Sequence, residues 1–169
     1  LCNNTEHQDT TSILPQYTTI EVSPSERRSS VYTSDYRNEL SRLKIQATNS
    51  TLIDKQAISY VYDAICKDNG EKLNILDVGS AYGFVAADRF GNDARTGKIL
   101  CIDHNERVIE RAQILFADHE KLIFEAANAE SDTFVDDICR IMKSNGIEKI
   151  HVVFSALTLH HLKNPSRTL

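Results

Sequence analysis

The sequence predicts an α/β fold, with a parallel sheet of about four strands flanked by helices. Three observations lead to this prediction: short apolar runs recur along the chain, segments with helical spacing separate them, and polar or glycine-containing turns follow them. The four apolar runs are residues 73–78, 98–103, 122–126 and 150–155. Strands that alternate with helices specify a parallel sheet, and nearly continuous apolar character suits strands that are buried on both faces.

The composition is that of a globular chain. Apolar residues make up 41% and charged residues 25% of the 169 residues, which suits one domain of ordinary size. The net charge of −5 gives no indication of a nucleic-acid partner. No apolar run approaches membrane-spanning length, and no signal peptide is visible. We therefore expect no membrane partner and a cytoplasmic protein. Four cysteines without a C-x-x-C pair are expected to be free thiols, namely Cys2, Cys66, Cys101 and Cys139.

Three regions are expected along the chain. Residues 1–30 are polar and aperiodic and predict a flexible arm. Residues 31–70 predict helices that form a lid or approach, and residues 71–169 carry the sheet. The inward residues of the two early helices are expected to be Leu40, Leu43 and Ala47, and then Ile58, Val61, Tyr62 and Ile65. The second helix should end near Asn69-Gly70.

Helices are also expected between the strands. They cover residues 84–91, a segment from Glu106, and residues 131–143, and Asn164-Pro165 predicts one more helix start. Their inward residues are expected to be Val108, Ile109, Ala112, Leu115 and Phe116, and then Phe134, Val135, Ile138, Ile141 and Met142, with Cys139 on the same apolar face. Because the sheet is unfinished, later residues or a partner are expected beside the fourth strand. A chain that starts at Leu1 is expected to be part of a longer protein.

Polar residues gather where the predicted strands end, which is where an open α/β sheet binds its ligand. They are Asp77, Gly79, Asp103, His104, Asn128, Ala129 and Ser155. Asp103 lies twenty residues after Gly83, close to the spacing at which a carboxylate accepts the hydroxyls of a ribose. The plainer alternatives are that Asp77 caps a turn, that Asp103 is an exposed strand-end acid and that Asn128 is a turn residue.

The turn after the first strand does not fit a phosphate ligand. A dinucleotide site needs glycine at positions 79, 81 and 84, but only Gly79 is present and Phe84 is bulky. No Gly-Lys-Ser/Thr sequence is present, and no Lys or Arg lies between Asn74 and Asp88. A nicotinamide-dependent oxidoreductase is therefore the less favoured interpretation.

With the spacing G-x-G-x-G, two of three glycines are present, and the sequence resembles the class I, Rossmann-like methyltransferases that use S-adenosylmethionine (SAM). The segments that carry the resemblance are Glu39–Gln46, Leu76–Gly83, Ile102–Asn105, Ala127–Glu130 and Phe154–Leu162. It covers about Tyr36 to Leu169, the N-terminal part of such a domain, and is nearest to the small-molecule branch. This sequence has Ala81 at the central glycine and Asn128 where the family more often has Asp.

The resemblance implies SAM as cofactor and a role for each motif residue. Gly79, Ser80, Ala81 and Gly83 would pack against the methionine part, with Asp77 near its amino group. Asp103 would hold the ribose, His104 would cover the adenine, Asn128 and Ala129 would meet the adenine edge, and Ser155 would lie near the reactive methyl. Tyr36, Arg42 and Gln46 are candidates for a lid that clamps the carboxylate, although a solvated helix face explains the last two equally simply. An anionic cleft suits a sulfonium ligand without phosphate.

No catalytic residue is assigned. His160 and His161 are weak candidates for a base, because an unperturbed imidazole titrates near neutrality, but the resembling branch often uses this turn structurally. No metal is expected. We predict transfer of a methyl group from SAM to an unidentified acceptor, with a small molecule favoured and the chain inactive by itself. The alternative is a SAM-binding or interaction module that transfers nothing.

Overall fold

The computed structural model describes residues 36–49, 51–66, 70–156 and 158–163. Two helices come first, α1 (Tyr36–Asn49) and α2 (Thr51–Ile65). The alternating part then runs β1 (Leu73–Val78), α3 (Phe84–Ala86), a π-helical turn η2 (Ala87–Gly91), β2 (Thr96–Asp103), α4 (Glu106–Leu115), β3 (Leu122–Ala126), α5 (Phe134–Ser144), β4 (Val152–Phe154) and a 3₁₀ turn η3 (Leu159–His161). The expected α/β fold is confirmed.

Within the described ranges, four strands form one parallel sheet in the order β3-β2-β1-β4. In the register, Leu76 of β1 lies between Leu100 of β2 and Val153 of β4. The chain builds outward from β1 to β3 and then returns to the other side of β1. Connections therefore diverge at the carboxyl ends of β1 and β4, and a ligand cleft is expected at this point in such a sheet.

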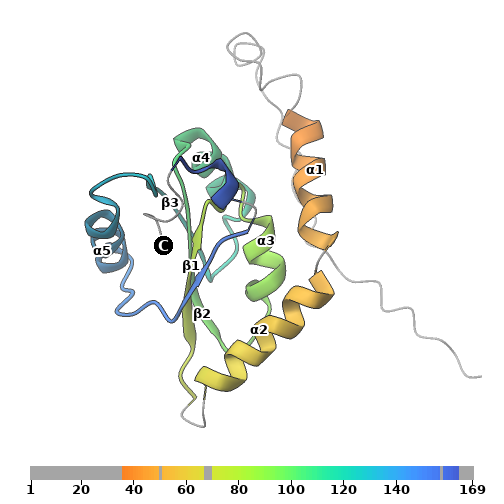
Figure 1. Cartoon of the computed structure of the whole chain (residues 1–169), viewed down its shortest axis with the longest axis vertical. Helices are drawn as coiled ribbons and strands as arrows, with labels where there is room; N and C mark the ends of the chain where they lie inside the picture. Colours follow the sequence, from red (N-terminus) through yellow and green to blue (C-terminus); the bar gives the residue numbers. More distant parts are fainter. Residues whose placement is uncertain (1–35, 50, 67–69, 157, 164–169) are drawn as a thin grey trace, which may run out of the picture.

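The sheet has a hydrophobic core on each face. One core joins β1 and β2 to α2, α3 and α4, with Ile75, Ile99 and Phe84 among its buried residues. The other core packs β1 and β2 against α5 through Ile138 and Ile141. Figure 1 shows the same layering, with α5 on one side of the sheet and α2 and α3 on the other. Burial on both faces explains the continuous apolar runs of the sequence.

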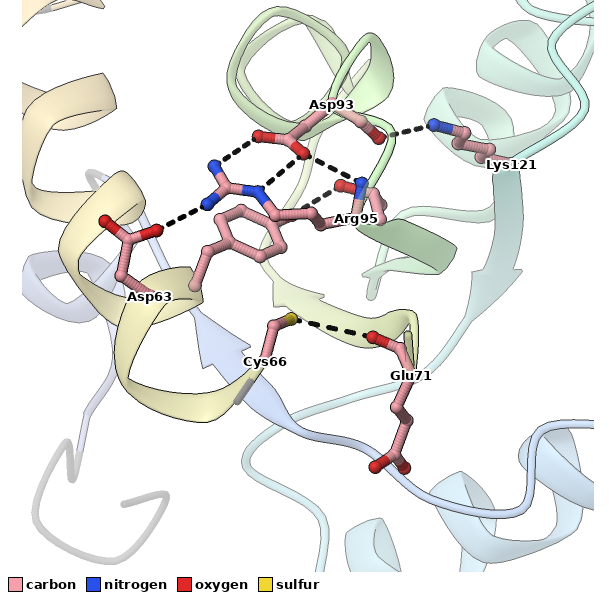
Figure 2. Close-up of polar contacts among 8 residues, drawn as sticks. Asp63, Cys66, Glu71, Asp93, Arg95 and Lys121 are labelled. Carbon is pink, nitrogen blue, oxygen red and sulfur yellow. Dashed lines mark hydrogen bonds and ion pairs between the residues drawn. The ribbon is translucent and has the colours of Figure 1, made fainter. Parts of the chain in front are cut away.

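Helix α2 packs against the amino-terminal end of the sheet, which is opposite the end where the cleft is expected. The Arg95 guanidinium lies 4.5 Å from the Tyr62 ring centre. It binds Asp63 at 2.7 Å and Asp93 at 2.8 Å, and Figure 2 marks both of these contacts. The Tyr62 hydroxyl bonds to Thr96. These contacts hold α2 against the start of β2.

A buried arginine makes a second attachment of α2. Arg89, in η2, has 1% of its side chain exposed and donates to Asp54 of α2 at 2.9 and 3.0 Å. It also binds Asp88 at 2.5 Å. A buried charge needs such partners to offset its lost hydration.

Some predicted boundaries are wrong by a few residues. β2 begins at Thr96 and β4 covers only Val152–Phe154. α5 begins at Phe134 because the residues before it form turns, in which Ser131 N donates to Asn128 O and Phe134 N donates to Ser131 O.

Four predicted inward residues are exposed. Val61 and Ile65 are 40% and 42% exposed, Val135 is 71% exposed, and Cys139 is also exposed. Each helix buries only the narrow stripe that touches the sheet, so apolar residues at the stripe's margin stay in solvent. Cys101 is buried, and Cys66, Cys101 and Cys139 are free thiols.

Several predictions fall outside the described residues. They concern the arm at 1–30, the helix start at Asn164-Pro165, and Cys2. The predicted end of the second helix near Asn69-Gly70 is wrong, because α2 ends at Ile65 and Cys66 is not helical. In the described part of the chain, no helix has the length and apolar character needed to cross a bilayer.

Candidate functional site

A cleft of about 740 Å³ opens at the carboxyl ends of the strands. Its walls come from the loops after all four strands and from α1. Seven of the predicted cofactor residues line it, namely Gly79, Ser80, Ala81, Asp103, His104, Asn128 and Ala129. The volume falls in the range of small-molecule sites.

The loop after β1 has a left-handed backbone at Gly79 (φ 74°), Ala81 (φ 47°) and Gly83 (φ 76°). Its amide groups are satisfied inside the protein. The N–H groups of Gly79 and Ser80 both donate to Ile102 O at 2.9 Å, Ala81 N donates to Asp103 Oδ2 at 3.1 Å, and Gly83 N donates to Ser80 O at 2.8 Å. These four donors are therefore not directed at a ligand phosphate.

Ala81 occupies a conformation that normally favours glycine. Ala81→Gly should relieve about 1–2 kcal/mol of left-handed strain and lose about 0.5–1 kcal/mol through greater freedom of the unfolded chain. We expect a net stabilisation of up to about 1 kcal/mol in urea unfolding. A clear loss of stability would show that the Ala81 side chain makes a compensating contact.

Asp103 joins the first two loops of the cleft. Its Oδ2 accepts from Ala81 N, and its Oδ1 accepts from Asn105 N at 3.0 Å. The side chain is 14% exposed, and His104 Nδ1 lies 3.3 Å from Oδ1. Each carboxylate oxygen has two lone pairs, so these bonds leave capacity for a ligand hydroxyl.

Asp77 lies in the sheet beside the cleft and is not part of its lining. It is 2% exposed, in register with Cys101 and Phe154. Burial raises the pKa of the Asp77 carboxyl from 3.8 to about 7, and the nearby charge of Asp103 adds to this rise. A carboxyl group with this pKa is part neutral at physiological pH, and a nearby cation would favour its charged form.

Ser80 carries a buried hydroxyl in the cleft wall. The residue is 8% exposed, and its Oγ has no hydrogen-bond partner among the residues that the structure describes. A buried polar group without a partner costs stability.

The loop after β3 supports the turn interpretation of Asn128 while also placing it in the cleft lining. Asn128 Oδ1 accepts from Glu130 N at 3.0 Å, which fixes the turn. Glu130 Oε1 in turn accepts from Lys163 N at 2.6 Å, so this loop is tied to the segment after β4.

Gly83, in the loop after β1, and Ser155, directly after β4, do not line the cleft. A Cβ on Gly83 would meet the Phe124 ring at 2.5 Å, so this glycine packs into the core. The Ser155 hydroxyl donates to Val78 O at 3.0 Å and ties β4 to β1. Both residues support the loop in this structure, and their contact with a cofactor stays a prediction.

Two of the three predicted lid residues on α1 reach the cleft, as does Leu43 of the same helix. Arg42 and Gln46 line the cleft, and Arg42 Nη1 donates to Gln46 Oε1 at 3.0 Å. The side chain of Tyr36 lies outside the described part of the structure. The lid role of these three residues stays a prediction.

The segment after β4 contributes His161 and a residue that the sequence interpretation missed, Thr158. The Thr158 hydroxyl donates to Gly79 O at 3.1 Å. The sequence shows a hydroxyl residue in the turn after the fourth strand. It does not show that this hydroxyl bonds to Gly79, which lies 79 residues earlier. The side chain of His160 is outside the described residues, so only His161 is placed in the cleft lining.

Comparison with known proteins supports the fold. No protein-family model matches the sequence, and no curated protein matches it. Among solved structures, the chain is similar to a selenomethionine-substituted CurJ carbon methyltransferase, with 18% identity and a TM-score of 0.51 over 68% of this chain. It is also similar to the DszA carbon methyltransferase, with 20% identity and a TM-score of 0.50 over 85% of this chain.

The sheet order and these matches show a Rossmann-like α/β fold like that of the two carbon methyltransferases, present in part. The matches cover 29% of the CurJ chain and 33% of the DszA chain, so this chain spans about a third of the length of the structures it resembles.

Proposed function

We propose that the cleft binds SAM and that the chain belongs to an enzyme that transfers the methyl group of SAM to a small-molecule acceptor. The observation that carries this proposal is the combination of two acids, Asp77 and Asp103, with a loop whose amides are satisfied internally. Such a site favours a cation and offers no phosphate cradle. SAM is a nucleoside with a sulfonium and an ammonium group and without phosphate.

The cleft and the sheet beside it hold a chemically suitable group for each part of the cofactor. Asp103 in the lining would accept the ribose hydroxyls, and its carboxylate, together with that of Asp77 buried beside the cleft, would balance the positive charges. Arg42 and Gln46 would meet the carboxylate from α1. His104, Asn128 and Ala129 would contact the adenine.

The bound cofactor supplies an activated methyl group for direct displacement by the acceptor. This chain's contribution would be to hold and orient that methyl, which can account for a large part of such a rate enhancement. No residue is assigned as a base. The expectation that later residues or a partner cover β4 also stays a proposal; within the described residues β4 pairs with β1 alone, and Val153 is exposed.

Calorimetric titration tests the cofactor directly. We expect SAM to bind and NAD⁺ not to bind, because NAD⁺ carries a pyrophosphate. Binding of NAD⁺ in preference to SAM would reject the proposal. Binding of SAM without turnover over a broad acceptor panel, in a protein that includes the downstream residues, would instead favour the non-catalytic module.

Asp103→Asn is expected to weaken SAM binding about a hundredfold, since hydrogen bonds to a charged group are worth about 1.5–3 kcal/mol and a charge complementary to the ligand is lost. Asp136→Asn is the matched control, because it removes an equal charge from the exposed face of α5, outside the cleft lining. The control should bind as the unmodified chain does. Equal affinities for the two variants would contradict the role of Asp103.

A further inference from the structure

The turn after β4 holds the loop after β1 by two hydroxyl groups. Ser155 Oγ donates to Val78 O at 3.0 Å, and Thr158 Oγ1 donates to Gly79 O at 3.1 Å. Two successive carbonyl groups of the loop are thus fixed from the β4 side. Thr158 Oγ1 also lies 3.2 Å from Ala156 O, within its own turn.

Thr158 also fills the space beside Gly79. A Cβ on Gly79 would lie 2.8 Å from the Thr158 Cβ and would overlap the hydroxyl and methyl groups of Thr158 still more closely. The bare backbone of Gly79 therefore rests directly on the Thr158 side chain. Gly79 and Thr158 both line the cleft, so their contact fixes how closely the loop after β1 approaches the turn after β4 in the cleft wall.

The loop is held from the opposite side by β2. Gly79 N and Ser80 N donate to Ile102 O, and Ala81 N donates to Asp103. Thr158 supplies the restraint at the Gly79 carbonyl from the β4 side, and Ser155 supplies the one at the Val78 carbonyl. Loss of the Thr158 restraint should shift the loop relative to Asp103, because only the β2 contacts and the Ser155–Val78 hydrogen bond would then determine its position.

We propose that Thr158 is a positioning residue for the cofactor, which fixes the orientation of the Gly79–Ala81 loop through its hydrogen bond to the Gly79 carbonyl. This inference rests on the proposed binding of SAM. The Thr158 hydrogen bond would then raise the affinity for SAM, in addition to the stability of the folded chain that any buried hydrogen bond supplies.

Thr158→Val keeps the shape of the side chain and removes the donor. We expect SAM to bind about tenfold more weakly, the equivalent of one net hydrogen bond. Thr158→Ser keeps the hydroxyl and should bind SAM nearly as the unmodified chain does. The matched control is Thr48→Val, since the Thr48 hydroxyl also donates to a backbone carbonyl, Ile45 O at 2.8 Å, but lies on α1 outside the cleft lining.

Calorimetry with SAM and urea unfolding are measured on all four proteins. A Thr158→Val variant that unfolds more easily but binds SAM with unchanged affinity would show a purely structural role and overturn this inference alone. If the unmodified chain does not bind SAM, the proposed function fails and the inference fails with it. If Thr158→Val does not fold, Thr158→Ala takes its place with the same expected loss of affinity.

Discussion

Asp77→Asn is expected to stabilise the folded chain at pH 8 by about 4 kcal/mol, because burial makes ionisation of the Asp77 carboxyl costly and asparagine carries no charge. The pKa of Asp77 is raised to about 7 in the folded chain from 3.8. Below about pH 4 the carboxyl group is neutral in both the folded and the unfolded chain, and the free energy of unfolding is highest. As the pH rises from about 4 to about 7, the free energy of unfolding falls, since only the unfolded chain ionises freely in this window.

Urea unfolding of the two proteins at pH 4.5, 6 and 8 measures this effect. The advantage of Asp77→Asn should grow from pH 4.5 to pH 8, and at pH 8 it should be much larger than any effect of the control Asp136→Asn, which changes an exposed acid. An advantage that shrinks toward pH 8 would contradict the buried-acid account. The same substitution should weaken SAM binding, which would explain why the sheet retains a destabilising acid.

Gly83→Ala is expected to destabilise the chain by about 3 kcal/mol. The left-handed backbone contributes about 1–2 kcal/mol, and overlap of the new methyl group with Phe124 adds about 1–3 kcal/mol. The Phe124 ring is buried among other side chains and cannot move away freely.

Gly146→Ala separates the two contributions. Gly146 has a similar backbone angle, φ 64°, but no atom lies within 4 Å of a Cβ at this position. This control should therefore show the backbone strain alone, at about 1 kcal/mol. Equal losses of unfolding free energy in the two variants would show that Gly83 is not tightly packed.

The order of strands and helices could be predicted from the sequence because each apolar run is bounded by clear turn residues. β1 and β3 were predicted with the bounds observed. Exposure was harder to predict: the spacing of Val61, Ile65 and Val135 shows that they share a helix face with buried residues, but it does not show how much of that face the sheet covers.

The site shows the same limit. The residues directly after the strands, such as Asp103 and Asn128, were placed correctly in the cleft lining, because parallel strands end at one edge of the sheet. Thr158 was missed and Ser155 was placed in the cleft, because the direction of each hydroxyl depends on a carbonyl group 77 or 79 residues away. Such contacts depend on the three-dimensional path of the turn, which local residue preferences do not determine.

The most direct test of the account is a titration of the ¹⁵N-labelled chain with SAM, followed by amide chemical shifts. The account predicts that shifts concentrate at Gly79–Ala81, at Asp103 and His104, and at Asn128 and Ala129, with little change near Arg95 at the opposite end of the sheet. Saturating SAM that leaves these three loops unchanged, or that shifts only residues around Arg95, would contradict it.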